Sequence, residues 1–202
     1  MTGIPQGALR GPLFVGARFL AALLVALACS AIGASPRAEE LYDVFLDSGE
    51  GEVLQIATLA VDAFDRDDGY RLSFSEQPFG DYFLSMRPFR CIERGETMLC
   101  HLPYPYENRR RLGREALTDL EYDLLFIARS PTEYGIDPWN GRYFRLRWEG
   151  DGIVGDLYET DLGILAAPPE GGNLRPLAEV DMVAMEPGGG PWAPVLRILP
   201  RR

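Results

Sequence analysis

The feature that most constrains the fold is an alternation of apolar and polar residues with a period of two, interrupted by Gly, Pro and Asp-Gly turns. Such alternation is typical of antiparallel strands with one buried and one solvent-facing side. The sequence therefore predicts a mainly antiparallel β (α+β) fold, a single meander or barrel-like domain. The expected strands are Glu52–Phe64, Tyr70–Ser75, Asp81–Met86, Phe89–Glu93, Thr97–Leu102, Tyr143–Trp148, Ile153–Tyr158, Val180–Met185 and Val195–Leu199.

Turn residues predict the register of a first hairpin around Asp67-Asp68-Gly69. A three-residue loop with Gly69 in the left-handed conformation places Asp65 opposite Arg71 and Phe64 opposite Leu72. Both cross-strand pairs are favourable, whereas a two-residue loop would oppose two arginines. The acidic loop does not have the ligand spacing of a calcium site, and we expect no metal there.

A second hairpin is predicted around Gly150-Asp151-Gly152. In its first strand the apolar and basic residues alternate, so they occupy opposite faces. Phe144, Leu146 and Trp148 form the apolar face, and Arg145 and Arg147 the basic one.

One helix is predicted over residues 118–128. Thr118-Asp119-Leu120-Glu121 matches a capping box, in which the first and fourth side chains bond to unpaired amides at a helix start. The apolar spacing of Leu120, Leu124 and Ile127 indicates the buried face.

Cys91 and Cys100 flank a second kind of turn signal, Gly95-Glu96. A two-residue type II′ turn at that dipeptide places the two cysteines directly opposite each other, at a non-hydrogen-bonded pair where Cα atoms approach closely. We therefore predict a structural disulfide between Cys91 and Cys100. Two buried thiols and a redox pair are the alternatives, and a redox pair normally has a Cys-x-x-Cys spacing.

Residues 1–34 have the layout of a secretory signal peptide. An apolar run from Phe19 to Ala34 follows Arg10 and Arg18 and ends in small residues. It is shorter than the roughly 20 residues of a membrane-spanning helix. We expect cleavage after Ala34, or after Ala38, leaving 35–202 as one mature β-rich domain without an integral membrane anchor.

Two other interpretations of this segment are open. The first is a retained anchor. The second is lipidation at Cys29, although Ala26 stands where bacterial lipoproteins usually carry Leu. The expected location is periplasmic or secreted, by a cleaved Sec-type signal in a bacterium.

Composition excludes several chemistries. The chain has no lysine and a single histidine, His101, so Schiff-base chemistry, a phosphate-loop lysine and multi-histidine zinc sites are ruled out. Removal of residues 1–34, which hold two arginines and no acids, changes the net charge from −10 to −12. So negative a surface disfavours nucleic acid as a partner. We predict no cofactor, no metal and no catalytic residue.

A local basic and aromatic segment is the candidate surface for binding an anion or a partner. It comprises Tyr104, Tyr106, Arg109, Arg110 and Arg111. Tyrosine rings offer flat contact area and guanidinium groups bind carboxylates and phosphates. The alternative is structural, with these arginines paired to Asp119, Glu121 and Asp123.

The segments PFRCIERGETMLCHLPYPYENRR, LTDLEYDLLFIA and YGIDPWNGRYFRL resemble an uncharacterised family of exported proteobacterial proteins. The resemblance covers about residues 80–185. It implies a periplasmic location and implies no reaction.

These observations favour a non-catalytic periplasmic protein that binds a partner or small ligand or contributes to the envelope. A second hypothesis is a lipocalin-like carrier of a small apolar ligand, with Trp139, Phe144 and Trp148 around one cavity. A third is a hydrolase that uses paired carboxylates.

Overall fold

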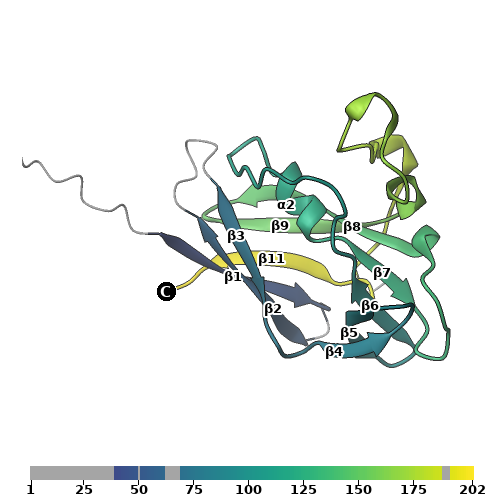
Figure 1. Cartoon of the computed structure of the whole chain (residues 1–202). Helices are drawn as coiled ribbons and strands as arrows, with labels where there is room; N and C mark the ends of the chain where they lie inside the picture. The colour runs from purple at the N-terminus through teal and green to yellow at the C-terminus, as the bar shows by residue number, and fades with distance from the viewer. Residues whose placement is uncertain (1–38, 50, 62–68, 188–191) are drawn as a thin grey trace, which may run out of the picture. The chain divides into compact units, whose positions relative to one another are not determined.

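The computed structural model describes residues 39–49, 51–61, 69–187 and 192–202, and its strands form one antiparallel sheet that curls into a half-barrel (Figure 1). The predicted signal segment and its cleavage sites lie outside these residues. The strands are β1 (Glu40–Asp47), β2 (Val53–Val61), β3 (Tyr70–Phe74), β4 (Gly80–Phe83), β5 (Pro88–Arg94), β6 (Thr97–His101), β7 (Phe126–Arg129), β8 (Gly141–Glu149), β9 (Gly152–Thr160), β10 (Met182–Ala184) and β11 (Val195–Pro200).

Two meanders make up the sheet, and the C-terminal strand joins them. The order is β3-β2-β1-β11-β9-β8-β7-β6-β5-β4, and β10 pairs with β9 off this path. Strand β11 lies between β1 and β9, so the last strand of the chain completes the sheet. The predicted antiparallel β architecture is confirmed, but β11 interrupts the single meander, and the α+β label fits only loosely.

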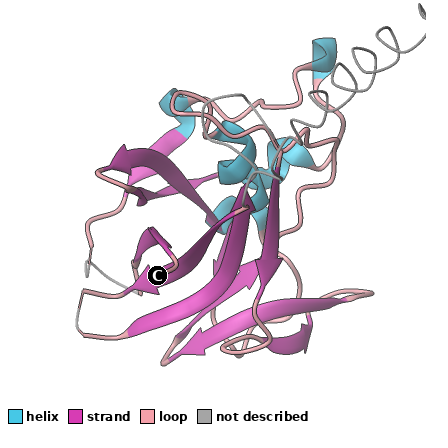
Figure 2. Cartoon of the chain, turned by 90° about the vertical axis from the view of Figure 1, so that its left-hand side faces the viewer, coloured by secondary structure: helices cyan, strands magenta, loops and turns pink. Residues whose placement is uncertain are grey.

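The main core is formed by residues of β1, β2, β8, β9 and β11 together with the helical segment at 117–124. It includes Val44, Leu59, Phe144, Leu157 and Ile198, all nearly or fully buried. A second cluster lies on the other side of β7 and β8, where residues 162–182 cover it. Strands β6 and β7 are therefore buried on both faces, and Figure 2 shows the helical segments gathered toward one end of the sheet.

The β5–β6 hairpin has the predicted register. Cys91 is paired with Cys100, and a disulfide joins them. The turn residue Gly95 has a φ of +57°, and a type II′ turn requires a positive φ at its first central position. The disulfide packs with Leu84, Phe89 and Met98 in a small third cluster. The disulfide prediction is confirmed.

The register predicted for the first hairpin is wrong. Leu72 is paired with Leu59 instead of Phe64, and Arg71 lies opposite Ala60 instead of Asp65. The connection between β2 and β3 is thus longer than a three-residue loop, and Asp65, Asp67 and Asp68 lie outside the described residues. The buried side of β2, not the turn signal, sets this register, because Leu59 and Val61 belong to the core.

The β8–β9 hairpin agrees with its prediction. Its strands are paired from Gly141↔Thr160 to Glu149↔Gly152, with the turn at Gly150-Asp151. Phe144 and Leu146 are buried, whereas Arg145 and Arg147 are exposed on the opposite face.

The predicted helix is shorter than expected. Helix α2 spans Thr118–Asp123, and the segment from Phe126 is strand β7. The apolar residues of this segment suit either a helix or a buried strand, and pairing with β6 and β8 selects the strand. The predicted strand 180–185 is also reduced, to a short 3₁₀ turn (η4, Glu179–Asp181) followed by β10.

Candidate binding groove

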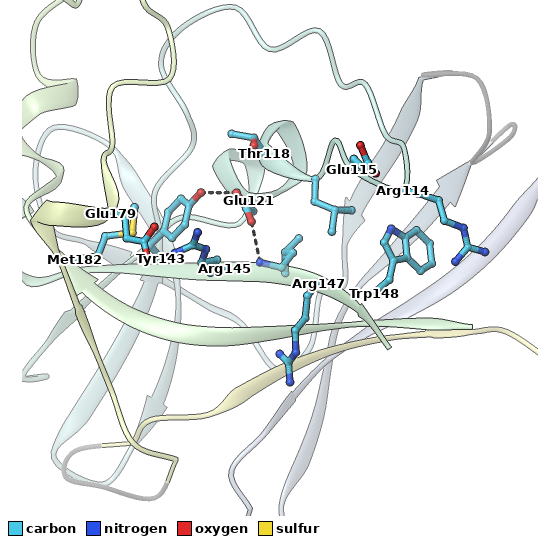
Figure 3. Close-up of a pocket in the computed structure, with 12 residues that line it drawn as sticks. Arg114, Glu115, Thr118, Glu121, Tyr143, Arg145, Arg147, Trp148, Glu179 and Met182 are labelled. Carbon is cyan, nitrogen blue, oxygen red and sulfur yellow. Dashed lines mark hydrogen bonds and ion pairs between the residues drawn. The ribbon is translucent and has the colours of Figure 1, made fainter. Parts of the chain in front are cut away.

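A groove of about 450 Å³ lies beside β8 in the described part of the chain. One wall is α2 with the residues that precede it, and the floor is β8 (Figure 3). Residues 179–182 close one end. The twelve lining residues are Arg114, Glu115, Leu117, Thr118, Glu121, Tyr143, Arg145, Leu146, Arg147, Trp148, Glu179 and Met182.

The groove exists because β8 extends beyond the end of its neighbour β7. Strand β8 is paired with β9 along its whole length, but with β7 only at Arg142↔Phe126 and Gly141↔Ile127. Beyond these two pairs, β7 does not extend along β8. Helix α2 takes the place of a strand there, burying Leu120 and Leu124 in the main core.

Glu121 links the helix to this edge. Its Oε1 accepts the Leu146 amide hydrogen at 2.8 Å, and its Oε2 accepts the Tyr143 hydroxyl. Glu121 is 6% exposed, and burial raises the pKa of its carboxyl above the ordinary range, while both hydrogen bonds oppose that shift. The carboxyl is therefore positioned by two donors that belong to β8.

The predicted capping box is wrong. The N-cap of α2 is Leu117, without a side-chain hydrogen bond to the helix start, and Thr118 is the first helical residue. Glu121 points away from the helix amides toward β8, where its carboxyl accepts from one buried strand amide and one buried phenol.

The groove carries three guanidinium groups. Arg145 lies 2.8 Å from Glu179, and Arg147 lies 2.8 Å from Asp156. The hydrogen bond to Arg145 lowers the pKa of Glu179. Arg114 lies over the Trp148 ring at 5.0 Å from its centre. The Arg145 and Arg147 pairs are about half exposed, so they contribute little to stability and can exchange partners.

The chemistry of the lining favours binding. Among the described residues that line the groove there is no His or Cys, and Thr118 and Tyr143 supply the hydroxyls. The Tyr143 hydroxyl is engaged by Glu121, and burial raises its pKa, so it stays protonated. The described residues contain no group of three or more His, Cys, Asp or Glu able to hold a metal ion.

The predicted tyrosines lie against a cation that the sequence did not reveal. Tyr104 and Tyr122 enclose the Arg175 guanidinium, whose carbon lies 4.8 and 4.9 Å from the two ring centres. Arg175 also forms an ion pair with Asp119 at 2.6 Å. The Tyr106 hydroxyl donates to the Leu165 carbonyl. Both predicted tyrosines thus tie segments 102–106 and 162–177 together.

The three predicted arginines have different surroundings. Arg110 forms an ion pair with Asp123 at 3.3 Å and has a φ of +54°. The Arg111 amide donates to Asp119, while Arg109 is exposed. The structural alternative paired these arginines with Asp119, Glu121 and Asp123. Asp119 and Asp123 do contact this segment, whereas Glu121 bonds to β8.

The aromatic residues of the carrier hypothesis do not share one cavity. Trp139 is 69% exposed in a 3₁₀ turn (η1, Pro138–Asn140), and Phe144 packs edge-on against Phe126 in the main core. Trp148 alone of the three lines the groove.

His101 lies in a separate cavity of about 240 Å³. Its ring packs on Phe74 at 4.2 Å, and its Nε2 lies 3.1 Å from the Asp123 carbonyl oxygen. Burial lowers the pKa of His101 to about 4, so the ring is neutral near pH 7.

Within the described ranges, no helix has both the length and the apolar character needed to cross a membrane. No family model, curated protein or solved structure matches the chain.

Proposed function

We propose that the protein is an exported, non-catalytic binding protein of the bacterial cell envelope, and that its ligand site is the groove between α2 and β8. The observation that carries the proposal is the groove itself. It lies beside the part of β8 that β7 does not cover, and the buried Glu121 on its wall is held by two hydrogen bonds. A preformed cavity with a few fixed polar groups is the usual form of a binding site.

Three observations support export. Residues 1–34 have the charge and apolar pattern of a signal peptide. The resemblance to exported proteobacterial proteins also favours export. The Cys91–Cys100 disulfide suits an oxidising compartment, where such bonds persist.

A binding role fits the groove better than catalysis does. His101, the chain's one histidine, does not line the groove. It lies in a different cavity, where its ring is bonded to the carbonyl of Asp123, 22 residues further along the sequence. Glu121 has a raised pKa, as a general acid needs, so a carboxylate-dependent hydrolase is the second candidate. Both Glu121 oxygens are engaged by β8, however, and Glu179 is paired with Arg145.

Native mass spectrometry of protein isolated from the cell envelope tests the proposal. We expect a bound species on the wild type that is absent from the double variant Arg145→Ala, Arg147→Ala. The matched control is Arg71→Ala, which removes an exposed arginine of β3 that is paired with Glu39, and it should keep the bound species. Wild-type protein without any bound species, or a species retained by the double variant, would contradict the proposal.

The same material tests export. The measured mass should correspond to a chain without residues 1–34. It should also be about 2 Da, the mass of two hydrogens, below that of the same chain with reduced cysteines, because of the disulfide. Full-length protein confined to the cytoplasm would overturn this part of the proposal.

A further inference from the structure

The cavity of about 240 Å³ that contains His101 is separate from the groove, because the two share no lining residue. Leu72, Phe74, Pro103 and Tyr104 give this cavity apolar and aromatic walls, and three polar side chains complete its lining. Two of the lining residues, Tyr104 and Arg110, belong to the basic and aromatic segment that the sequence analysis singled out as a binding surface.

The carboxylate of Asp123 lines this cavity but is already engaged by the protein. Its Oδ1 accepts a hydrogen bond from the Asn108 side-chain amide at 2.8 Å, and its Oδ2 accepts one from the Tyr70 hydroxyl at 2.8 Å. Its charge is balanced by Arg110, whose Nε lies 3.3 Å from Oδ2. The two ionised groups of the lining are thus paired with each other, and a charged ligand would bring a charge that the lining does not balance.

His101 provides an unused hydrogen-bond acceptor. Its Nε2 lies 3.1 Å from the carbonyl oxygen of Asp123, which accepts only, so Nε2 carries the ring hydrogen. Because burial lowers the pKa of His101 to about 4, the ring is neutral near pH 7 and Nδ1 keeps its lone pair. Among the described residues Nδ1 has no hydrogen-bond partner, and solvent still reaches it. Since His101 lines the cavity, this lone pair is available to a donor bound there.

Arg110 provides hydrogen-bond donors at a fixed position. Its backbone amide donates to Asn108 Oδ1 at 2.9 Å, and its carbonyl accepts from the Tyr70 amide at 3.1 Å. Asp123 holds its Nε, while its two Nη groups form no hydrogen bond within the described ranges. The side chain is 55% exposed, so these donors lie on the solvent side of the cavity.

We infer that this cavity is a second binding site, which takes a small uncharged aromatic compound with a hydroxyl group. The hydroxyl donates to His101 Nδ1, an acceptor elsewhere on the ligand bonds to Arg110, and the aromatic ring lies against the walls formed by Phe74 and Tyr104. A few fixed polar groups among apolar walls are typical of a small-molecule site, and the volume suits one aromatic ring with small substituents. The inference goes beyond the proposed function, because it does not depend on the groove.

A titration with 4-hydroxybenzamide, followed by NMR and calorimetry, tests the inference. We expect saturable binding that shifts the imidazole signals of His101, the only histidine of the chain. The matched compound 4-methoxybenzamide should bind about tenfold more weakly, because its ether oxygen has no hydrogen to donate to Nδ1. The anion 4-hydroxybenzoate should also bind more weakly than the amide, because the lining does not balance its charge.

The variant His101→Phe separates hydrogen bonding from packing. It keeps an aromatic ring beside Phe74 and removes Nδ1. It should weaken binding of 4-hydroxybenzamide about tenfold and leave the affinity for 4-methoxybenzamide unchanged, whereas a merely structural effect would weaken both.

The variant Arg110→Asn tests the donor. Asparagine tolerates the φ of +54° at this position, so the backbone is kept. Both amides should bind more weakly to it, and to a similar extent. The matched control is Arg71→Ala on β3, which removes another exposed, ion-paired arginine and should leave both affinities unchanged.

The comparison of the compounds on the wild-type protein decides the matter without any variant. Absence of 4-hydroxybenzamide binding, equal affinities for the hydroxy and methoxy compounds, or tighter binding of the anion would overturn the inference. The proposed function of the groove has its own test, the bound species that the double variant Arg145→Ala, Arg147→Ala loses.

Discussion

The Leu146 amide on β8 donates a hydrogen bond of 2.8 Å to Glu121 on α2, and this bond joins the helix to the strand edge that β7 leaves unpaired. Glu121 also accepts from Tyr143, so one buried carboxyl satisfies two groups of β8. The helix is thereby fixed in the wall of the half-barrel, and the groove lies beside this junction.

Replacing Glu121 should destabilise the fold. Glu121→Ala leaves two buried donors without their acceptor, and we expect a loss of about 2–4 kcal/mol in the free energy of unfolding. Glu121→Gln keeps one acceptor oxygen and should lose about 1–2 kcal/mol near pH 7. Urea unfolding of the three proteins measures these differences. Equal stability of Glu121→Ala and the wild type would contradict the assigned role.

The same carboxyl gives a pH dependence with a definite sign. Because burial raises the pKa of Glu121 in the folded state, its contribution is fully present below its ordinary pKa of 4.5 and falls as the pH rises through the folded value. The stability advantage of wild type over Glu121→Gln should therefore be larger at pH 4 than at pH 7. An advantage that grows with pH would show that the folded pKa is not raised.

His101 should titrate near pH 4. As the chain has one histidine, a single imidazole signal in the proton NMR spectrum reports its pKa. The lowered pKa means that its contribution to stability is present above about pH 6.5 and is lost as the pH falls toward 4, by about 3 kcal/mol at most. His101→Gln should flatten this part of the stability profile. A midpoint near 6.5 in the folded protein would refute the prediction.

Loss of the disulfide should weaken the fold without changing it. The bond closes a ten-residue loop, which the chain-entropy model values at roughly 2.5–3 kcal/mol. The double variant Cys91→Ala, Cys100→Ala removes it together with some packing against Met98. We expect a lower midpoint of unfolding and an unchanged far-UV circular dichroism spectrum. A stability equal to that of the oxidised wild type would contradict this prediction.

Replacing Arg175 should lower the stability of the fold more than replacing Arg109, an exposed arginine. Its guanidinium is enclosed by two tyrosine rings and paired with Asp119, so Arg175→Ala should cost about 1–3 kcal/mol. Arg109→Ala, the matched control, removes an exposed side chain and should change stability by less than about 0.5 kcal/mol. Equal effects of the two substitutions in thermal unfolding would count against the enclosed site.

Local signals predicted the parts of the fold that local chemistry determines. The turn at Gly95-Glu96 sets a register that the structure confirms, and the hairpin predicted around Gly150-Asp151-Gly152 is present with its turn at Gly150-Asp151. The segment 126–129 was predicted as helix because its apolar residues fit either periodicity, and only its pairing with β6 and β8 makes it a strand. The insertion of β11 between β1 and β9 joins residues about 150 positions apart, which no local pattern indicates.

The sequence did not predict the groove. The pattern at 118–121 matched a capping box, whereas the acid at its fourth position bonds to a strand 25 residues further along. In the sequence, Glu121 stands between an apolar and an aromatic residue, Leu120 and Tyr122, and in the structure all three are buried. Arg145 and Arg147 were predicted to share the face opposite the apolar residues, which is correct, but their place beside the groove depends on where β7 ends.

Backbone NMR of the protein with and without the species that co-purifies from the cell envelope tests the central claim most directly, because the residues on the two sides of the groove have separate amide signals. The account predicts that the largest shifts occur at residues 114–118 and 145–148, which line the groove. They should be absent from the double variant Arg145→Ala, Arg147→Ala. Shifts confined to β3 or β4, or no shifts in the groove, would contradict the account.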